Sequence, residues 1–247
     1  MINPFYRTEL LLGKDAMDKL KNSTVAIFGI GGVGSFAAEA LVRSGLGSIY
    51  LIDYDIIDIT NINRQIHATM KTVGLPKVEV MKERILEINP NINITVFKEK
   101  YGPETKEMLL SHKYDYVIDA IDMISSKIDL IVECKKRNIP IISSMGAGNK
   151  LNPAMFKVGD IYSTRVCPMA KVMRYELRKR NIKSLKVVWS DEVPKPVNLE
   201  KEGVRKAIPG SVGFVPPVVG FIMASEVIKD ICFKEVQDGK DRNSKES

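Results

Sequence analysis

Glycines at a regular spacing are the first residues in this sequence that could do chemistry. Gly29, Gly31 and Gly34 follow a short apolar run as G-x-G-x-x-G, with Gly32 inside the same loop. Such glycines permit a tight turn, close approach of the backbone to a phosphate, and close packing of the helix that follows. Asp53 comes about 20 residues later, where a carboxylate can accept ribose hydroxyl hydrogen bonds. The pattern predicts a nucleotide site and fits a redox dinucleotide or ATP equally.

Polar side chains further along distinguish these two nucleotides. A lysine in the first turn of a helix, as expected for Lys77 after Pro76, opposes the helix dipole at a cost of about 0.3–1 kcal/mol, and a phosphate ligand would explain it. The Arg64 guanidinium suits phosphate oxygens, although a surface ion pair would explain it equally. Two cations beside a metal-binding carboxylate are more than hydride transfer requires. They fit attack on the α-phosphate of ATP, because negative charge then develops on phosphate oxygens. The candidate residues are Asn61, Arg64, Lys77, Asp119 and Asp122.

Each of the two carboxylates has an alternative interpretation. Asp122 could hold a Mg²⁺ that bridges phosphates, or it could cap the N-terminus of a helix. Asp119 could do the same, or merely end a strand. In a doubly wound sheet, ligands bind beyond the carboxyl ends of the strands, where all of these groups are expected.

Alternating strand and helix patterns must position these residues. They predict an α/β fold, a Rossmann-like, doubly wound, mostly parallel sheet with a C-terminal α+β extension. The division expected is an ATP-binding core at 1–148, an extension at 149–233 and a polar tail at 234–247, all within one domain. The expected strands are Thr24–Gly29, Ser48–Asp53, Asn91–Phe97, Tyr114–Ala120, Ile139–Ser143, Phe156–Val158 and Leu185–Trp189. The expected helices are Thr8–Leu20, Ser35–Ser44, Pro76–Ile88, Pro103–Leu110, Ser125–Arg137, Cys167–Asn181 and Phe214–Cys232, and Asp191–Gly210 is expected to be a mobile loop over the site.

Composition narrows the protein class. The chain has 247 residues, 45% of them apolar, and a net charge of +7. Its three cysteines form no C-x-x-C pair, which indicates a reducing cytoplasm and no structural zinc. The N-terminus has no apolar signal core, and the longest apolar run, Gly213–Met223, is interrupted by prolines and is too short for a confident membrane span. We therefore expect a cytoplasmic protein with no membrane partner.

A basic helix is the second group of candidate residues. The segment Lys171–Lys186 carries seven basic residues and one acidic residue. Met169, Val172, Met173 and Leu177 are spaced as a buried stripe, so the basic residues should face outward. Such a face is usually just solvated, but it could also bind nucleic acid phosphates. The candidates for contact with a nucleic acid are Lys171, Arg174, Arg178, Lys179 and Arg180.

Few other side chains suggest chemistry. Cys167 precedes Pro168 at the expected helix start, so it could be a nucleophile with a lowered pKa, or it could sit in the helix cap, which we favour. Cys134 is expected in the core. His67 has no Ser or Cys partner at a recognisable spacing and is interpreted as structural or close to the substrate.

The spaced motifs GIGGVGS, LIDYDIIDITNINRQIH, VGLPKVEVMKERILEINP and VIDAID together resemble the ubiquitin-activating-type adenylating enzymes, the ThiF/MoeB/HesA superfamily. The resemblance covers Ser23–Gly148, about half of the chain. It implies an ATP-dependent enzyme that adenylates a carboxylate, and a homodimer. The roles it implies are ribose binding by Asp53, phosphate binding by Asn61, Arg64 and Lys77, magnesium binding by Asp122, and a reach into the partner subunit's ATP by Arg7.

Within the superfamily the chain most resembles the tRNA threonylcarbamoyladenosine dehydratases, through TNINRQIHA, VIDAID, SMGAGNKLNP and a C-P-x-A-K segment. That resemblance implies adenylation of the threonylcarbamoyl carboxylate of tRNA and ring closure by a carbamoyl nitrogen. The alternatives are an adenylyltransferase for a sulfur-carrier or ubiquitin-like protein, an NAD-dependent oxidoreductase, and an RNA-binding module without turnover. The sequence leaves open a monovalent cation (Na⁺ or K⁺) and a sulfur-transfer or redox partner protein.

Overall fold

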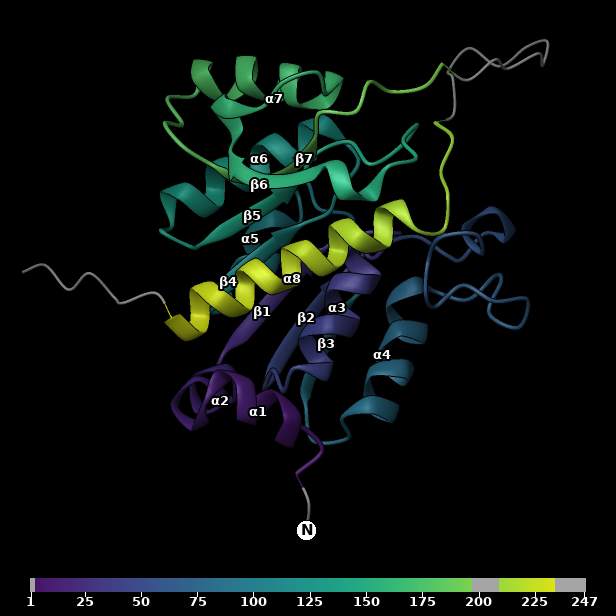
Figure 1. Ribbon diagram of the computed structural model, residues 1–247, viewed down its shortest axis with the longest axis vertical. Coiled ribbons are helices and arrows are strands. Elements are labelled where there is room, and N and C mark those ends of the chain that lie inside the picture. The colour runs from purple at the N-terminus through teal and green to yellow at the C-terminus, as the bar shows by residue number, and fades with distance from the viewer. Residues whose placement is uncertain (1–2, 197–208, 234–247) are drawn as a thin grey trace, which may run out of the picture.

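In the part of the chain that the structure describes, seven strands form a single sheet in the order β3-β2-β1-β4-β5-β7-β6 (Figure 1). The coordinates are a computed structural model, and the structure describes residues 3–196 and 209–233. Only β6 runs antiparallel to its neighbour, β7; the other strand pairs are parallel. The strands are β1 (Thr24–Phe28), β2 (Ser48–Ile52), β3 (Asn93–Phe97), β4 (Tyr116–Asp119), β5 (Ile141–Ser144), β6 (Phe156–Asp160) and β7 (Lys186–Ser190). The predicted mostly parallel α/β sheet is confirmed.

Helices cover both faces of the sheet, because the strands are apolar on both faces. Along β1, Val25 and Ile27 belong to one core cluster, whereas Ala26 and Phe28 belong to the other. The first cluster is completed by α2 (Lys14–Lys21), α3 (Gly34–Arg43), α4 (Lys77–Ile88) and α8 (Val215–Phe233). The second is completed by α5 (Lys106–Leu109), α6 (Ile124–Lys136) and α7 (Pro168–Lys179).

Strand order fixes where a ligand can bind. From β1 the chain adds β2 and β3 on one side, then returns to add β4 and β5 on the other. The loops that leave β1 and β4 therefore diverge at the carboxyl edge of the sheet, which is where doubly wound sheets bind ligands.

The N-terminal region is helical, as the prediction for Thr8–Leu20 has it. Two helices occupy it, α1 (Tyr6–Leu12) and α2, where the sequence pattern shows no break. They separate at Gly13, whose φ of +86° lies in the left-handed region that ends a helix. The run of leucines before Gly13 continues the helical pattern of the sequence and conceals this break.

The C-terminal half joins the same sheet and core. β7 pairs with β5, and α8 crosses α3 with Gly220 at the contact, where a Cβ atom would lie 2.4 Å from the Val33 carbonyl oxygen. α8 begins at Val215, so its two prolines lie in the first turn and not before it. No helix among residues 3–196 and 209–233 is long and apolar enough to cross a membrane. Most of the loop expected at Asp191–Gly210, and the tail at 234–247, lie outside the described residues.

Candidate active site

A cavity of about 630 Å³ opens at the carboxyl edge of the sheet. Its walls come from the loops that follow β1, β2, β4 and β5, together with the N-terminal ends of α4 and α7. Twelve of the lining residues are Gly29, Gly31, Gly32, Asp53, Asp55, Asn61, Arg64, Gln65, Lys77, Asp122, Lys150 and Cys167. The cavity thus collects most of the residues that the sequence singled out.

The glycine loop has the geometry that its spacing predicts. Gly29 has a φ of +89°, and a Cβ atom there would lie 2.7 Å from the Ala120 carbonyl oxygen at the end of β4. A Cβ atom on Gly34 would lie 1.9 Å from the Gly29 carbonyl oxygen, so α3 starts directly on the loop. Gly31, Gly32 and Val33 line the cavity directly before α3, so the N-terminal end of this helix borders the cavity and favours an anion there.

Asp53 directly follows β2 and is 8% exposed. Its carboxylate accepts hydrogen bonds from the backbone N–H groups of Ile30 (2.6 Å) and Asp55 (2.9 Å). Burial raises the pKa of the Asp53 carboxyl, while the Lys77 charge and the two N–H donors oppose that rise. Each oxygen keeps a further lone pair, so the carboxylate is held in place and still able to accept ribose hydroxyls.

Lys77 is the first residue of α4, and Pro76 is the N-cap. The side chain is only 7% exposed, and its ammonium forms a 2.7 Å ion pair with Asp55. The Lys77 backbone N–H also donates to the Asp55 carbonyl oxygen at 3.1 Å. Asp55 was not singled out in the sequence, although it lies two residues beyond Asp53. It compensates for a cation at a helix N-terminus and holds that cation at the cavity wall.

Asn61 and Arg64 come from the segment between β2 and α4, which begins with a short 3₁₀ helix (Ile59–Asn61). The Asn61 side-chain oxygen accepts from the Asp58 N–H at 3.1 Å, which leaves its NH₂ group as a donor. Arg64 Nη1 donates to the Thr60 carbonyl oxygen and to Asn63 Oδ1, each at 2.9 Å. Among the described residues no carboxylate pairs with Arg64, so the surface ion pair considered above is absent there.

Asp122 is exposed at the mouth of the cavity. The N-cap of α6 is Met123, so Asp122 does not cap this helix. Within residues 3–196 and 209–233 no cluster of three or more acidic, histidine or cysteine side chains could hold a metal ion by itself. A lone carboxylate still fits Mg²⁺, which commonly binds through one or two carboxylates and the substrate phosphates.

Asp119 does not reach the cavity, in contrast to its expected role in cofactor binding. It is fully buried, and its carboxylate accepts from Lys127 Nζ at 2.8 Å and from Ser143 Oγ at 2.7 Å. Along β4 the Asp119 side chain lies on the face of the sheet that α6 covers, where it bonds to one residue of α6 and one of β5. The carboxylate also accepts from the Ile121 N–H at 3.2 Å, so it supports the loop that carries Asp122 and does not line the cavity.

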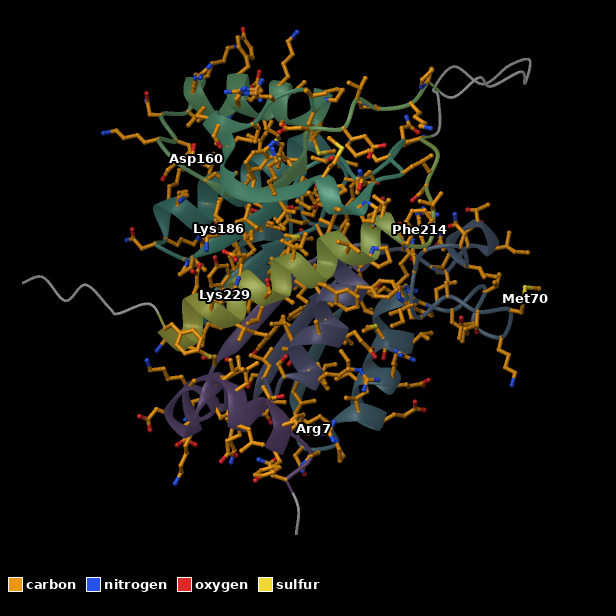
Figure 2. The ribbon with its side chains drawn as sticks, in the orientation of Figure 1. Arg7, Met70, Asp160, Lys186, Phe214 and Lys229 are labelled. Atoms are coloured by element: carbon orange, nitrogen blue, oxygen red, sulfur yellow. The ribbon has the colours of Figure 1, made fainter. Side chains whose placement is uncertain are left out.

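Arg7 and Cys167 occupy different places. Arg7 is exposed on α1, at the end of the molecule opposite α7, and does not line the cavity (Figure 2). Cys167 is the N-cap residue of α7 and lines the cavity, although its thiol makes no capping hydrogen bond. Cys134 is buried in the core, as predicted.

Gln65 is a site residue that sequence reasoning missed. It is 5% exposed, lines the cavity, and its side-chain oxygen has no hydrogen-bond partner among the described residues. Its position next to Arg64, within the motif TNINRQIHA, was the available signal. The oxygen itself is fully enclosed, so Gln65 lines the cavity through its other atoms and the unpartnered acceptor lies within the wall.

The basic helix is partly as expected. Ala170, Met173 and Leu177 form its buried stripe, but Val172 is 41% exposed. Arg174 is turned inward and donates to the backbone and side-chain oxygens of Thr164. The remaining candidates are exposed: Lys171, Arg178 above the Tyr162 ring, Lys179 above the Tyr175 ring, and Arg180 paired with Glu176.

Comparison with known proteins agrees with this architecture. The ThiF family matches residues 6–245. The chain is 50% identical to the tRNA threonylcarbamoyladenosine dehydratase of Bacillus subtilis, over 96% of this chain and 100% of that protein. The crystal structure of the E. coli tRNA N6-threonylcarbamoyladenosine dehydratase in complex with ATP superposes with a TM-score of 0.83 at 37% identity, covering 92% of this chain and 93% of that one. The chain belongs to the ThiF family.

Proposed function

We propose that this protein is an ATP-dependent tRNA threonylcarbamoyladenosine dehydratase. The observation that carries the proposal is one cavity in which a glycine loop and Asp53 adjoin Lys77 and Arg64, with further space toward β5 and α7. Its support from relatives is the 50% identity with the Bacillus subtilis dehydratase and the likeness to the E. coli dehydratase solved with ATP and with AMP.

The chemistry uses two displacements. A carboxylate oxygen of the threonylcarbamoyl group attacks the α-phosphorus of ATP, the bond to the bridging oxygen breaks, and pyrophosphate leaves. A carbamoyl nitrogen of the same group then attacks the activated acyl carbon, and AMP leaves with the former carboxylate oxygen. The ring closes with the net loss of one water. Because the attacking nitrogen belongs to the substrate, this reaction needs no protein nucleophile and gives Cys167 no covalent role.

The residues of the cavity fit these steps. Asp53 and the glycine loop would hold the ribose and the phosphates, with Asn61 and Gln65 at the cavity wall. Lys77 and Arg64 would stabilise the charge that develops on phosphate oxygens, which is the main catalytic requirement of phosphoryl and adenylyl transfer. Asp122 would hold a Mg²⁺ ion, which neutralises phosphate charge when bound.

Mass spectrometry provides a direct test. The protein is incubated with ATP, Mg²⁺ and tRNA that carries threonylcarbamoyladenosine, and we expect the modified nucleoside to lose the mass of one water as AMP forms. Lys77→Ala should lower turnover by about 10²–10³-fold, by analogy with the loss of one oxyanion donor. Unchanged turnover in that variant would remove Lys77 from the mechanism.

The same assay separates the alternatives. AMP exchange that needs a small protein ending in Gly-Gly, and not tRNA, would indicate a sulfur-carrier adenylyltransferase. Nicotinamide binding would indicate an oxidoreductase, and binding of RNA without AMP release would indicate an RNA-binding module. Omission of Na⁺ and K⁺ in turn tests whether a monovalent cation takes part.

A homodimer belongs to the proposal because Arg7 is remote from the cavity of its own chain. If Arg7 reaches the partner subunit's ATP, mixing inactive Arg7→Ala and Lys77→Ala chains should restore part of the activity through mixed dimers. Analytical ultracentrifugation reports whether the dimer forms.

A further inference from the structure

Lys150 is a buried lysine to which neither the sequence nor the proposed reaction has yet given a role. It follows β5 in the segment SMGAGNKLNP, is 3% exposed, and lines the cavity. Among residues 3–196 and 209–233, its ammonium has no hydrogen-bond or ion-pair partner. Although the residue as a whole is buried, its Nζ atom keeps contact with the cavity, where an anion that enters can pair with the ammonium.

The backbone on both sides of Lys150 is held firmly. Asn149 adopts a left-handed φ of +59°, and its side-chain oxygen accepts from the Gly210 N–H at 2.6 Å. The Asn149 N–H donates to the Gly210 carbonyl oxygen at 2.8 Å. On the other side, the Glu192 carboxylate accepts the N–H groups of Leu151 and Asn152, each at 2.9 Å. These hydrogen bonds hold the backbone from which the Lys150 side chain extends before a ligand binds.

The Glu192 carboxylate interacts electrostatically with Lys150, but its oxygens already accept the two backbone N–H groups. Burial favours its neutral form, but the two N–H donors and the charges of Lys150 and Lys195 outweigh burial and hold the pKa of Glu192 below its ordinary value. The carboxylate therefore partly offsets the Lys150 charge at a distance, while the ammonium itself stays available to a ligand.

The position of Lys150 in the fold indicates which of two anions it would bind, the phosphates of ATP or the carboxylate of the substrate. Asp53 and Asp55 follow β2, whereas Lys150 follows β5, and β1 and β4 lie between these strands. In the proposed function, Asp53, Lys77 and the glycine loop, which follow or adjoin β2 and β1, bind the ribose and phosphate groups. The anion that remains for the β5 side is the carboxylate to be activated.

We propose that Lys150 binds the carboxylate of the threonylcarbamoyl substrate and orients it toward the α-phosphate of ATP. This inference rests on the proposed function. An ammonium at this point would select tRNA whose adenosine carries an anionic group over the same tRNA without it. It would also place the attacking oxygen before pyrophosphate leaves, which is the kind of positioning that lowers the barrier of a two-substrate reaction.

The test compares two tRNAs and two affinities. Wild type and Lys150→Met, which keeps the unbranched shape and most of the length of the side chain but not the charge, are measured for binding to tRNA with and without threonylcarbamoyladenosine. Their ATP binding is measured by calorimetry. A hydrogen bond to a charged group is worth about 10- to 100-fold in affinity. We therefore expect Lys150→Met to lose the preference for modified tRNA and about 10- to 100-fold in kcat/KM, with ATP affinity changed less than about twofold.

Further variants separate binding from structure. Lys150→Arg should recover part of the preference because it restores the charge. Lys157→Met removes an exposed lysine of β6 and should behave as wild type. If Lys150→Met does not fold, Lys150→Gln takes its place in the same comparison.

Two results would overturn the inference while the proposed function stands. In one, the wild type is active and Lys150→Met keeps the same preference for modified over unmodified tRNA, or the active wild type itself shows no such preference. In the other, Lys150→Met loses ATP affinity in proportion to kcat/KM, which would assign Lys150 to the nucleotide phosphates. If wild type does not convert modified tRNA at all, the proposed function itself fails.

Discussion

The three most deeply buried lysines that the structure describes differ in what their ammonium groups contact. Lys127 is fully buried and bonded to Asp119 and Ser143, so its charge is satisfied within the fold. Lys77 is paired with Asp55 at the cavity wall, where a phosphate can share its charge. Lys150 faces the cavity without a partner among the described residues. The carboxylate beside each lysine therefore decides its role: Lys127 is satisfied within the fold, Lys77 can share its charge with a ligand, and Lys150 is available to a ligand.

His67 is a residue whose burial has a consequence for stability. It is 2% exposed, and neither ring nitrogen has a hydrogen-bond partner among the described residues. Burial, together with the charges of Lys77 and Arg84, lowers its pKa from 6.5 to about 4. The unfolded chain therefore binds more protons than the folded chain at mildly acidic pH. Stability is lost as pH falls below about 6.5, and the loss is complete below about 4.

The corresponding variant is His67→Leu, which removes both the titration and the unpartnered nitrogens. When the pH is lowered from 7.5 to 5, the unfolding free energy of the wild type should fall by about 2 kcal/mol more than that of His67→Leu, because only the wild type carries this histidine. Urea unfolding of both proteins at the two pH values measures this difference. All other titrating groups are shared, so equal pH dependence in the two proteins would contradict the assignment.

At the scale of elements, α8 supports the glycine loop from behind. Gly220 lets α8 approach α3, because a Cβ atom there would lie 2.4 Å from the Val33 carbonyl oxygen and 2.9 Å from the Ala37 nitrogen. One turn earlier on α8, the Pro216 Cβ lies 3.0 Å from where a Cβ of Gly32 would be. The helix that closes the fold thereby also fixes the position of the glycine loop.

Gly220→Ala should therefore affect both stability and nucleotide binding. The added methyl group meets backbone atoms that cannot rotate away, so we expect a loss of about 1–3 kcal/mol in unfolding free energy and weaker ATP binding. Gly102→Ala is the matched control, since a Cβ atom there meets nothing within 4 Å. Denaturant unfolding and calorimetric titration with ATP measure the two effects. An unchanged ATP affinity in folded Gly220→Ala would show that the loop does not depend on α8.

The elements that the sequence predicts correctly are those with local determinants. The spacing of Gly29, Gly31 and Gly34 and the apolar run before them suffice for the β1–α3 unit, because turn geometry and strand burial depend on neighbouring residues. The contact of Asp119 with Lys127 and Ser143 joins three elements, and nothing local distinguishes it from a ligand-facing carboxylate. The Lys77–Asp55 pair likewise depends on how the segment between β2 and α4 returns to the sheet.

At the scale of the whole molecule, positive charge is placed at a distance from the nucleotide site as well as within it. The chain carries a net charge of +7. α7 lies at the end of the molecule opposite α1 and α2 (Figure 1), while its first residues also line the cavity. A tRNA that places its modified nucleotide in the cavity could therefore rest its backbone on the outer face of α7. That face carries Lys171, Arg178, Lys179 and Arg180, of which Lys179 and Arg180 both pair with Glu176, whereas Arg174 is turned inward.

Reversal of charge on this face should reduce the salt dependence of tRNA binding. Each phosphate contact releases counterions, so its loss lowers the slope of log affinity against log salt concentration by about one. We expect Lys171→Glu with Lys179→Glu to lower the slope by about two and to weaken binding of modified and unmodified tRNA alike. The pair Lys14→Glu and Lys21→Glu on α2 changes the net charge equally at the opposite end. Fluorescence titration over a salt series measures the slope for each double variant. Equal slopes for the α7 variant and the α2 variant would mean that tRNA binding depends only on the total charge of the protein and that α7 makes no local contact with tRNA.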